Sequence, residues 1–101
     1  MSSDPLFHML VEDVFSIRGR GTVVTGKIDA GSLKVGDEIM IHSPKGDKKA
    51  VVTGIEAFRK TMEQVSSGGD AVGILLKDIT KDDVRKGDEL LSPGEDFTWK
   101  P

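Results

Sequence analysis

The fold of this protein is decided by residues 11–27, which read Val-Glu-Asp-Val-Phe-Ser-Ile-Arg-Gly-Arg-Gly-Thr-Val-Val-Thr-Gly-Lys. A turn signal at residues 18–21 precedes a β-branched run at residues 22–25, and we expect a hairpin there. Further strand-type runs stand at residues 7–11, 39–41, 51–58 and 71–76, and turn signals at residues 29–32, 43–47 and 66–70 separate them. Several short strands at this spacing predict an all-β barrel or sandwich.

One turn pattern occurs twice. Residues 33–37 and 84–88 each combine an apolar anchor, a basic residue and a Gly-Asp pair. Such a pair lets the chain reverse with a positive φ at the glycine, so each pattern predicts a turn into a strand that starts at Glu38 or Glu89. Three other glycines, Gly26, Gly54 and Gly73, lie inside strand-type runs, and we interpret them as sharp bends rather than functional positions.

These signals together predict one domain over residues 1–101, with a small closed antiparallel β-barrel over residues 6–92 and a partly ordered tail at residues 93–101. Thr80 precedes acidic residues as a helix N-cap would, so residues 80–84 are expected to form one short helical turn. Residues 61–65 fit a short strand or a helical turn equally well.

Composition narrows the class of protein. The chain has 101 residues, no Cys and a formal net charge of −3, so its core must be held by packing alone and any RNA contact must be local. No apolar run is long enough to span a bilayer, and no signal peptide pattern is present. We expect a soluble cytoplasmic protein with no membrane partner.

The residues that catalysis needs are scarce. His8 and His42 are far apart in sequence and belong to no metal-ligand or nucleophile–base spacing, and a phosphate loop of the form G-x-x-x-x-G-K-[ST] is missing. Glu12 and Asp13 would point to opposite faces of a strand, so they cannot act as a carboxylate pair. The sequence therefore predicts no enzyme activity, no catalytic residue, no metal site and no cofactor.

Three segments resemble the second, β-barrel domain of elongation factor Tu and related translational GTPases. They are residues 11–27, residues 54–60 (Gly-Ile-Glu-Ala-Phe-Arg-Lys) and residues 72–76 (Val-Gly-Ile-Leu-Leu), and the resemblance runs collinearly from about residue 6 to residue 92. The GTP-binding domain of that family is absent from this sequence. Together with Met1 and a tail unlike the family's third domain, this favours a free-standing protein over an excised domain.

The resemblance also implies a binding site. In elongation factor Tu this domain holds the 3′-terminal adenosine of aminoacyl-tRNA, and the matching positions here are Glu12, Ile17, Val23, Glu56, Arg59 and Leu75. Apolar side chains would contact the base, Arg59 would stack on it, and a carboxylate would accept from a ribose hydroxyl or an amino group. The sequence departs from the family at residues 77–78, where Lys-Asp replaces the usual Arg-Gly.

Three functions stay open at this stage. The first is weak binding of tRNA or ribosomal RNA in translation. The second is a protein-interaction module that docks on a translational GTPase or mimics part of one. The third is reuse of the pocket for a small nucleotide-like ligand. A positive rim around the pocket would favour RNA, and an apolar rim without one would favour protein. For the apolar candidates, burial in the core is the competing interpretation, and for Glu56 and Arg59 it is a surface ion pair.

Overall fold

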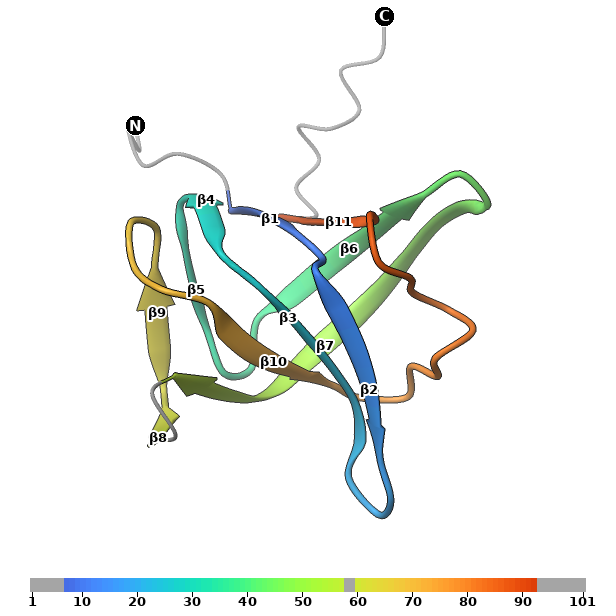
Figure 1. Ribbon diagram of the computed structural model, residues 1–101, viewed down its shortest axis with the longest axis horizontal. Coiled ribbons are helices and arrows are strands. Elements are labelled where there is room, and N and C mark those ends of the chain that lie inside the picture. Colours follow the sequence, from blue (N-terminus) through green and yellow to red (C-terminus); the bar gives the residue numbers. More distant parts are fainter. Residues whose placement is uncertain (1–6, 58–59, 93–101) are drawn as a thin grey trace, which may run out of the picture.

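The computed structural model describes residues 7–57 and 60–92. All regular structure in this part of the chain is β-strand, and all strand pairs are antiparallel (Figure 1). The strands are β1 (His8–Leu10), β2 (Asp13–Ile17), β3 (Gly21–Gly26), β4 (Ile28–Ala30), β5 (Ser32–Lys34), β6 (Glu38–Ser43), β7 (Gly46–Ala57), β8 (Lys60–Met62), β9 (Gln64–Ser66), β10 (Val72–Leu76) and β11 (Glu89–Leu91). The predicted all-β class is confirmed.

The main sheet follows the order β2-β3-β10-β7-β6-β11-β1-β4, with β8 added to β7, and β5 and β9 form a separate pair. This order is a path with two ends, so the expected closure into a barrel is not confirmed. The chain bends between β1 and β2, and again at Lys27 between β3 and β4, which divides two long segments into shorter strands. The two ends of the path, β2 and β4, belong to these two bent segments, which also pair with each other.

The core lies on the concave side of the sheet, where alternate residues of each strand are buried. In β3 and β10 the inward positions include Val24, Ile74 and Leu76, each with no exposed surface. The outward positions alternate with them and are half-buried. Because a strand points successive side chains to opposite faces, this alternation fixes which residues can reach a ligand from outside.

Both Gly-Asp patterns form the predicted turns. Gly36 has a φ of 100° and Gly87 a φ of 96°, and the following strands begin at Glu38 and Glu89 as expected. In the second turn, the Asp88 carboxylate accepts from the Arg85 N–H at 2.8 Å, and the Asp88 N–H donates to the Arg85 carbonyl at 3.0 Å. These reciprocal bonds satisfy backbone groups that would otherwise stay unpaired next to the core.

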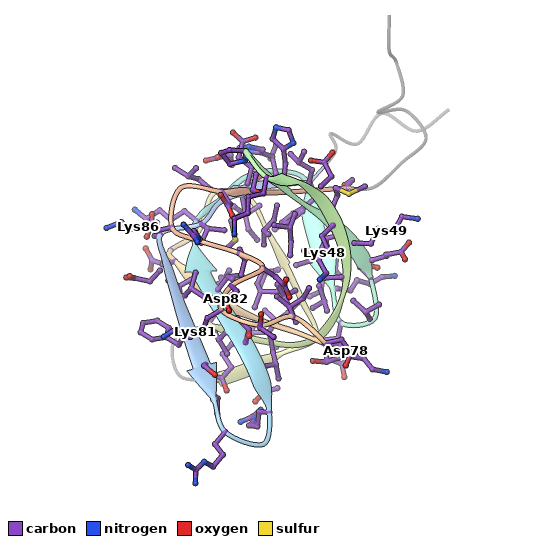
Figure 2. All side chains as sticks on the ribbon, turned by 90° about the vertical axis from the view of Figure 1, so that its right-hand side faces the viewer. Lys48, Lys49, Asp78, Lys81, Asp82 and Lys86 are labelled. Carbon is purple, nitrogen blue, oxygen red and sulfur yellow. The ribbon has the colours of Figure 1, made fainter. Side chains whose placement is uncertain are left out.

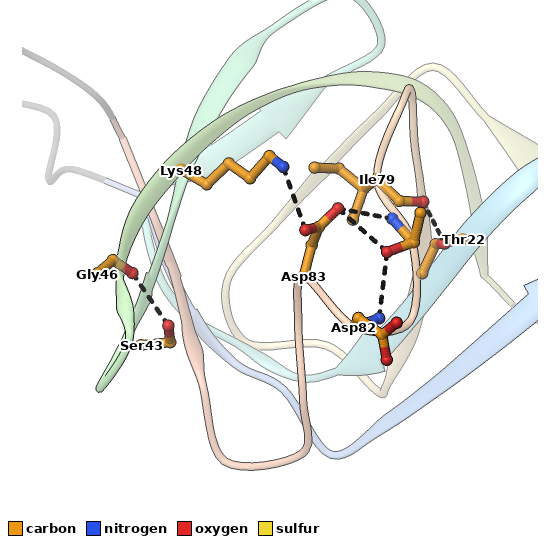
Figure 3. Close-up of polar contacts among 8 residues, drawn as sticks. Thr22, Ser43, Gly46, Lys48, Ile79, Asp82 and Asp83 are labelled. Atoms are coloured by element: carbon orange, nitrogen blue, oxygen red, sulfur yellow. Dashed lines mark hydrogen bonds and ion pairs between the residues drawn. The ribbon is translucent and has the colours of Figure 1, made fainter.

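The segment between β10 and β11 is not helical. Residues 81–83 form a turn, which Asp83 closes by accepting the Thr80 N–H at 2.9 Å while its own N–H donates to the Thr80 carbonyl (Figure 3). Thr80 does accept the Asp82 N–H, at 3.2 Å, but the turn stops there. The expected helical turn at residues 80–84 is therefore wrong. Residues 61–65, in contrast, take the strand form in β8 and β9.

Asp83 gives this segment a pH dependence. The Thr80 N–H and the Lys48 ammonium, 3.1 Å from the Asp83 carboxylate, lower the pKa of Asp83 below its ordinary value of 3.8. A depressed folded-state pKa contributes stability above pH 3.8 that is lost as the pH falls through the folded value. Asp83→Asn should thus destabilise the protein near neutral pH, and the difference from the parent should disappear in acid. Urea unfolding at a series of pH values tests this, with Asp82→Asn as the control of equal charge. Equal pH profiles for parent and Asp83→Asn would refute it.

Candidate functional site

The outer face of the sheet carries a row of aligned residues across four strands. Val23 of β3 lies opposite Phe15 of β2 on one side and opposite Leu75 of β10 on the other. Leu75 in turn lies opposite Gly54 of β7. All are outward positions, since their neighbours in β3 and β10 point into the core. The row therefore forms a continuous apolar strip on the surface.

A hollow opens along this strip, with a volume of about 50 Å³. Two glycines create it, because the missing side chains of Gly54 and Gly73 would otherwise cover it. A Cβ at Gly54 would stand 3.4 Å from the Leu75 side chain, and one at Gly73 would stand 3.4 Å from the Val23 side chain. The lining residues are Ile17, Arg20, Val23, Gly54, Ile55, Glu56, Thr61, Gly73 and Leu75.

The rim of the hollow is polar and of mixed charge. Arg20 comes from the turn between β2 and β3, Glu56 from β7, and Thr61 from β8, and all are exposed. Within the described residues neither Arg20 nor Glu56 takes part in a salt bridge. One guanidinium and one carboxylate thus stand beside an apolar floor, which is chemistry suited to a flat ring with polar edges.

Most of the strands that line this hollow, β3, β7, β8 and β10, lie within a recognised family of domains. The family model described as Elongation factor Tu domain 2 matches residues 21–91, more than two thirds of the chain. The chain belongs to the elongation factor Tu domain 2 family. The match runs from β3 to β11, so it includes Val23, Glu56 and Leu75 and begins after β2. Membership indicates a translation-related, non-catalytic module.

Four of the six residues predicted for the site line the hollow of this elongation factor Tu domain 2 fold. They are Ile17, Val23, Glu56 and Leu75. Glu12 is not among the lining residues; it lies exposed at the bend between β1 and β2, where its N–H donates to the Thr25 carbonyl at 2.7 Å. Arg59 lies outside the described residues.

The apolar members are not core residues. Val23 and Leu75 are half-buried on the outer face, and Ile17 is 39% exposed. The competing interpretation, that these three residues are buried in the core, is therefore wrong for Ile17, Val23 and Leu75 alike. Strand alternation accounts for this result, since Val24 and Ile74 occupy the inward positions beside them.

The sequence interpretation missed five of the lining residues: Arg20, Gly54, Ile55, Thr61 and Gly73. Gly73 lies inside β10, where the strand pairs in regular register with β3 and β7. Gly54 does lie beside a register shift, and Gly26 stands where β3 gives way to β4. The sequence did contain a signal for Gly73. In the alternating strand Val72–Leu76 it occupies an outward position, so the outer face has no side chain there.

The two histidines lie away from the hollow. His8 Nδ1 is 2.9 Å from an Asp29 carboxylate oxygen, and His42 Nδ1 is 2.6 Å from one of Asp47. In the described ranges, 7–57 and 60–92, no three His, Cys, Asp or Glu side chains are grouped to hold a metal ion. The same ranges contain no helix of the length and apolarity needed to cross a membrane.

Proposed function

We propose that this domain binds the terminal nucleoside of an RNA, such as the 3′ end of aminoacyl-tRNA or a ribosomal RNA segment, at the hollow between β2, β3, β10 and β7. The observation that carries the proposal is the glycine-floored apolar strip with Arg20 and Glu56 at its rim. Family membership supports it, because it indicates a module that works in translation. Glu12 and Arg59, taken from the resemblance, complete the proposed site.

The shape of the hollow sets how a base would bind. Pockets that enclose drug-sized ligands have volumes of about 300–1,000 Å³, whereas this hollow has about 50 Å³. A base would therefore lie across Val23 and Leu75 and stay open to solvent on its other face. An arginine guanidinium can cover such a face by stacking, and a carboxylate can accept from a ribose hydroxyl.

Binding of this kind should be weak and sensitive to salt. The formal net charge of −3 gives no overall attraction for phosphate, so only a few local cations contribute. NMR titrations at several salt concentrations test this, with an aminoacylated acceptor-stem mimic, its uncharged counterpart and AMP as ligands. Residues whose chemical shifts change during the titration identify the binding surface.

Arg20→Ala should weaken binding of the acceptor-stem mimic by about 1–3 kcal/mol, the usual range for losing a side chain that stacks on a base. Arg18→Ala is the matched control. It removes the same charge from the same turn, but Arg18 does not line the hollow, so it should alter mainly the salt dependence. Equal losses in the two variants, or shifts that leave Val23 and Leu75 unmoved, would reject the RNA site.

A specific observation favours the alternative, docking on a translational GTPase. The described rim holds Arg20 and Glu56, one charge of each sign, rather than the positive rim that RNA prefers. Titration with an isolated GTP-binding domain distinguishes the two functions. Shifts on the apolar strip with that domain, and none with any of the three nucleic-acid probes, would establish the docking function instead.

A further inference from the structure

β2 has an open edge. In the described part of the chain it pairs with β3 alone and forms one end of the main sheet. Proteins usually block such edges with Lys, Pro, bulges or very short strands. β4, at the other end, is three residues long and contains Asp29. β2 has five residues, Asp-Val-Phe-Ser-Ile, with no Lys, Arg or Pro, and its only charge, Asp13, stands at its first position.

The same strand carries exposed apolar surface. Five large apolar side chains in residues 7–57 and 60–92 are more than a third exposed, and two of them, Phe15 and Ile17, lie on β2. Phe15 is the most exposed, at 51%. Figure 2 shows β2, in blue, at the outer margin of the molecule, with its turn projecting beyond the other strands. An unblocked edge beside exposed apolar side chains is the usual surface for strand addition.

We propose that a second copy of this chain pairs with β2 along this edge, in antiparallel orientation about a two-fold axis at Phe15. This register places Phe15 opposite Phe15 of the second copy, so that two exposed aromatic side chains cover each other. It also places Glu12 opposite Arg18 of the second copy, twice by symmetry. Charge complementarity therefore accompanies the apolar contact, and a symmetric pair needs no other partner.

The dimer should be weak, because a single short strand pair buries much less than the ~1,200–2,000 Å² of a stable interface. The dimer would nevertheless change the binding surface that the protein offers to a ligand. An axis perpendicular to the sheet leaves the outer faces of both copies on one side, so two hollows would lie on one continuous surface. Two linked sites bind a ligand with two ends more tightly than either site alone.

Sedimentation velocity on the full chain, from about 10 μM to about 1 mM, tests the proposal. The parent should become dimeric toward the upper end of this range. Phe15→Lys places a charge at the axis and should raise the dimer dissociation constant at least about tenfold. Val51→Lys is the matched control, because Val51 is also exposed, at 37%, but lies on β7. It should leave the dimer intact.

A charge exchange tests the register itself. Glu12→Arg alone should weaken the dimer, since it sets two arginines opposite each other, and adding Arg18→Glu to the same chain should restore it. A non-symmetric or differently placed contact would not show this rescue. A parent that stays monomeric at about 1 mM, a dimer unaffected by Phe15→Lys, or a failed rescue would overturn the proposal. The proposal would also be overturned if the β2 edge paired only with a strand of a translational GTPase and not with a second copy of this chain.

Discussion

Gly26→Ala should lower the free energy of unfolding by about 3 kcal/mol, at the upper end of the usual range for overpacking. A Cβ at position 26 would stand 2.2 Å from the Leu10 carbonyl oxygen and 3.2 Å from the Met9 side chain. The carbonyl belongs to β1, which is held between β11 and β4, so neither backbone can move away without breaking strand pairs. Urea denaturation at neutral pH measures the loss.

Gly69→Ala is the control for this variant. No heavy atom lies within 4 Å of the Cβ that it would add, and its backbone is not in the left-handed region. It should leave stability unchanged or raise it by about 0.4–1 kcal/mol through the unfolded chain. A Gly26→Ala protein as stable as Gly69→Ala would show that β1 and β3 do not approach each other as the structure has them.

The longer strands were predictable because their residues alternate. The expected runs at residues 22–25, 39–41 and 71–76 correspond to β3, β6 and β10; β3 and β6 extend the first two by two and three residues, and β10 begins one residue after the start of the third. Three-residue strands such as β4 and β5 were not predicted, since so short a stretch shows no alternation of apolar and polar residues. These strands exist because longer neighbours and the bends of the chain hold them in place.

The Gly-Asp turns and residues 80–84 show what the local sequence can and cannot predict. The turns at Gly36 and Gly87 could be predicted from the local sequence alone, because they require only a glycine with a positive φ. At residues 80–84 the expectation of a helical turn from the N-cap and the acids was wrong, because the chain forms only a turn in which Asp83 accepts the Thr80 N–H. Lys48, which holds Asp83 from β7, is a long-range contact that the local pattern does not contain.

Asp78 illustrates the cost of a departure from the family. The structure gives it a φ of 58°, in the left-handed region where glycine is favoured and aspartate is tolerated. The family's usual glycine at this position thus has a backbone reason. Asp78 is exposed and is not among the residues that line the hollow, so the departure places a carboxylate on the surface outside the proposed site.

The proposed site could be predicted only in part. Residues on regular strands were found through the resemblance, and strand alternation turns them outward. Arg20 and Thr61 come from a turn and from β8, whose positions depend on how the hairpin and β7 are arranged in space. The place of Gly73 in the lining could not be predicted, because a glycine that opens a surface and a glycine that bends a strand look alike in sequence.

Ile74→Ala and Leu75→Ala affect adjacent residues, and we expect the first to reduce stability and the second to reduce binding. Ile74 has no exposed surface and lies between Val24 of β3 and Ile55 of β7. Removing its side chain leaves a cavity and should cost about 2–5 kcal/mol in the free energy of unfolding. Differential scanning calorimetry and urea denaturation measure this loss.

Leu75, the next residue, points outward into the hollow and is half-buried, so Leu75→Ala should cost about 1 kcal/mol of stability or less. Its expected effect falls on the ligand instead, because it removes the apolar floor on which a base or a docking partner would lie. Ile74→Ala protein that remains folded should still bind, whereas Leu75→Ala protein should not. If binding follows stability in both variants, the outer face of β10 is not the site, and the hollow is only the space left by Gly54 and Gly73.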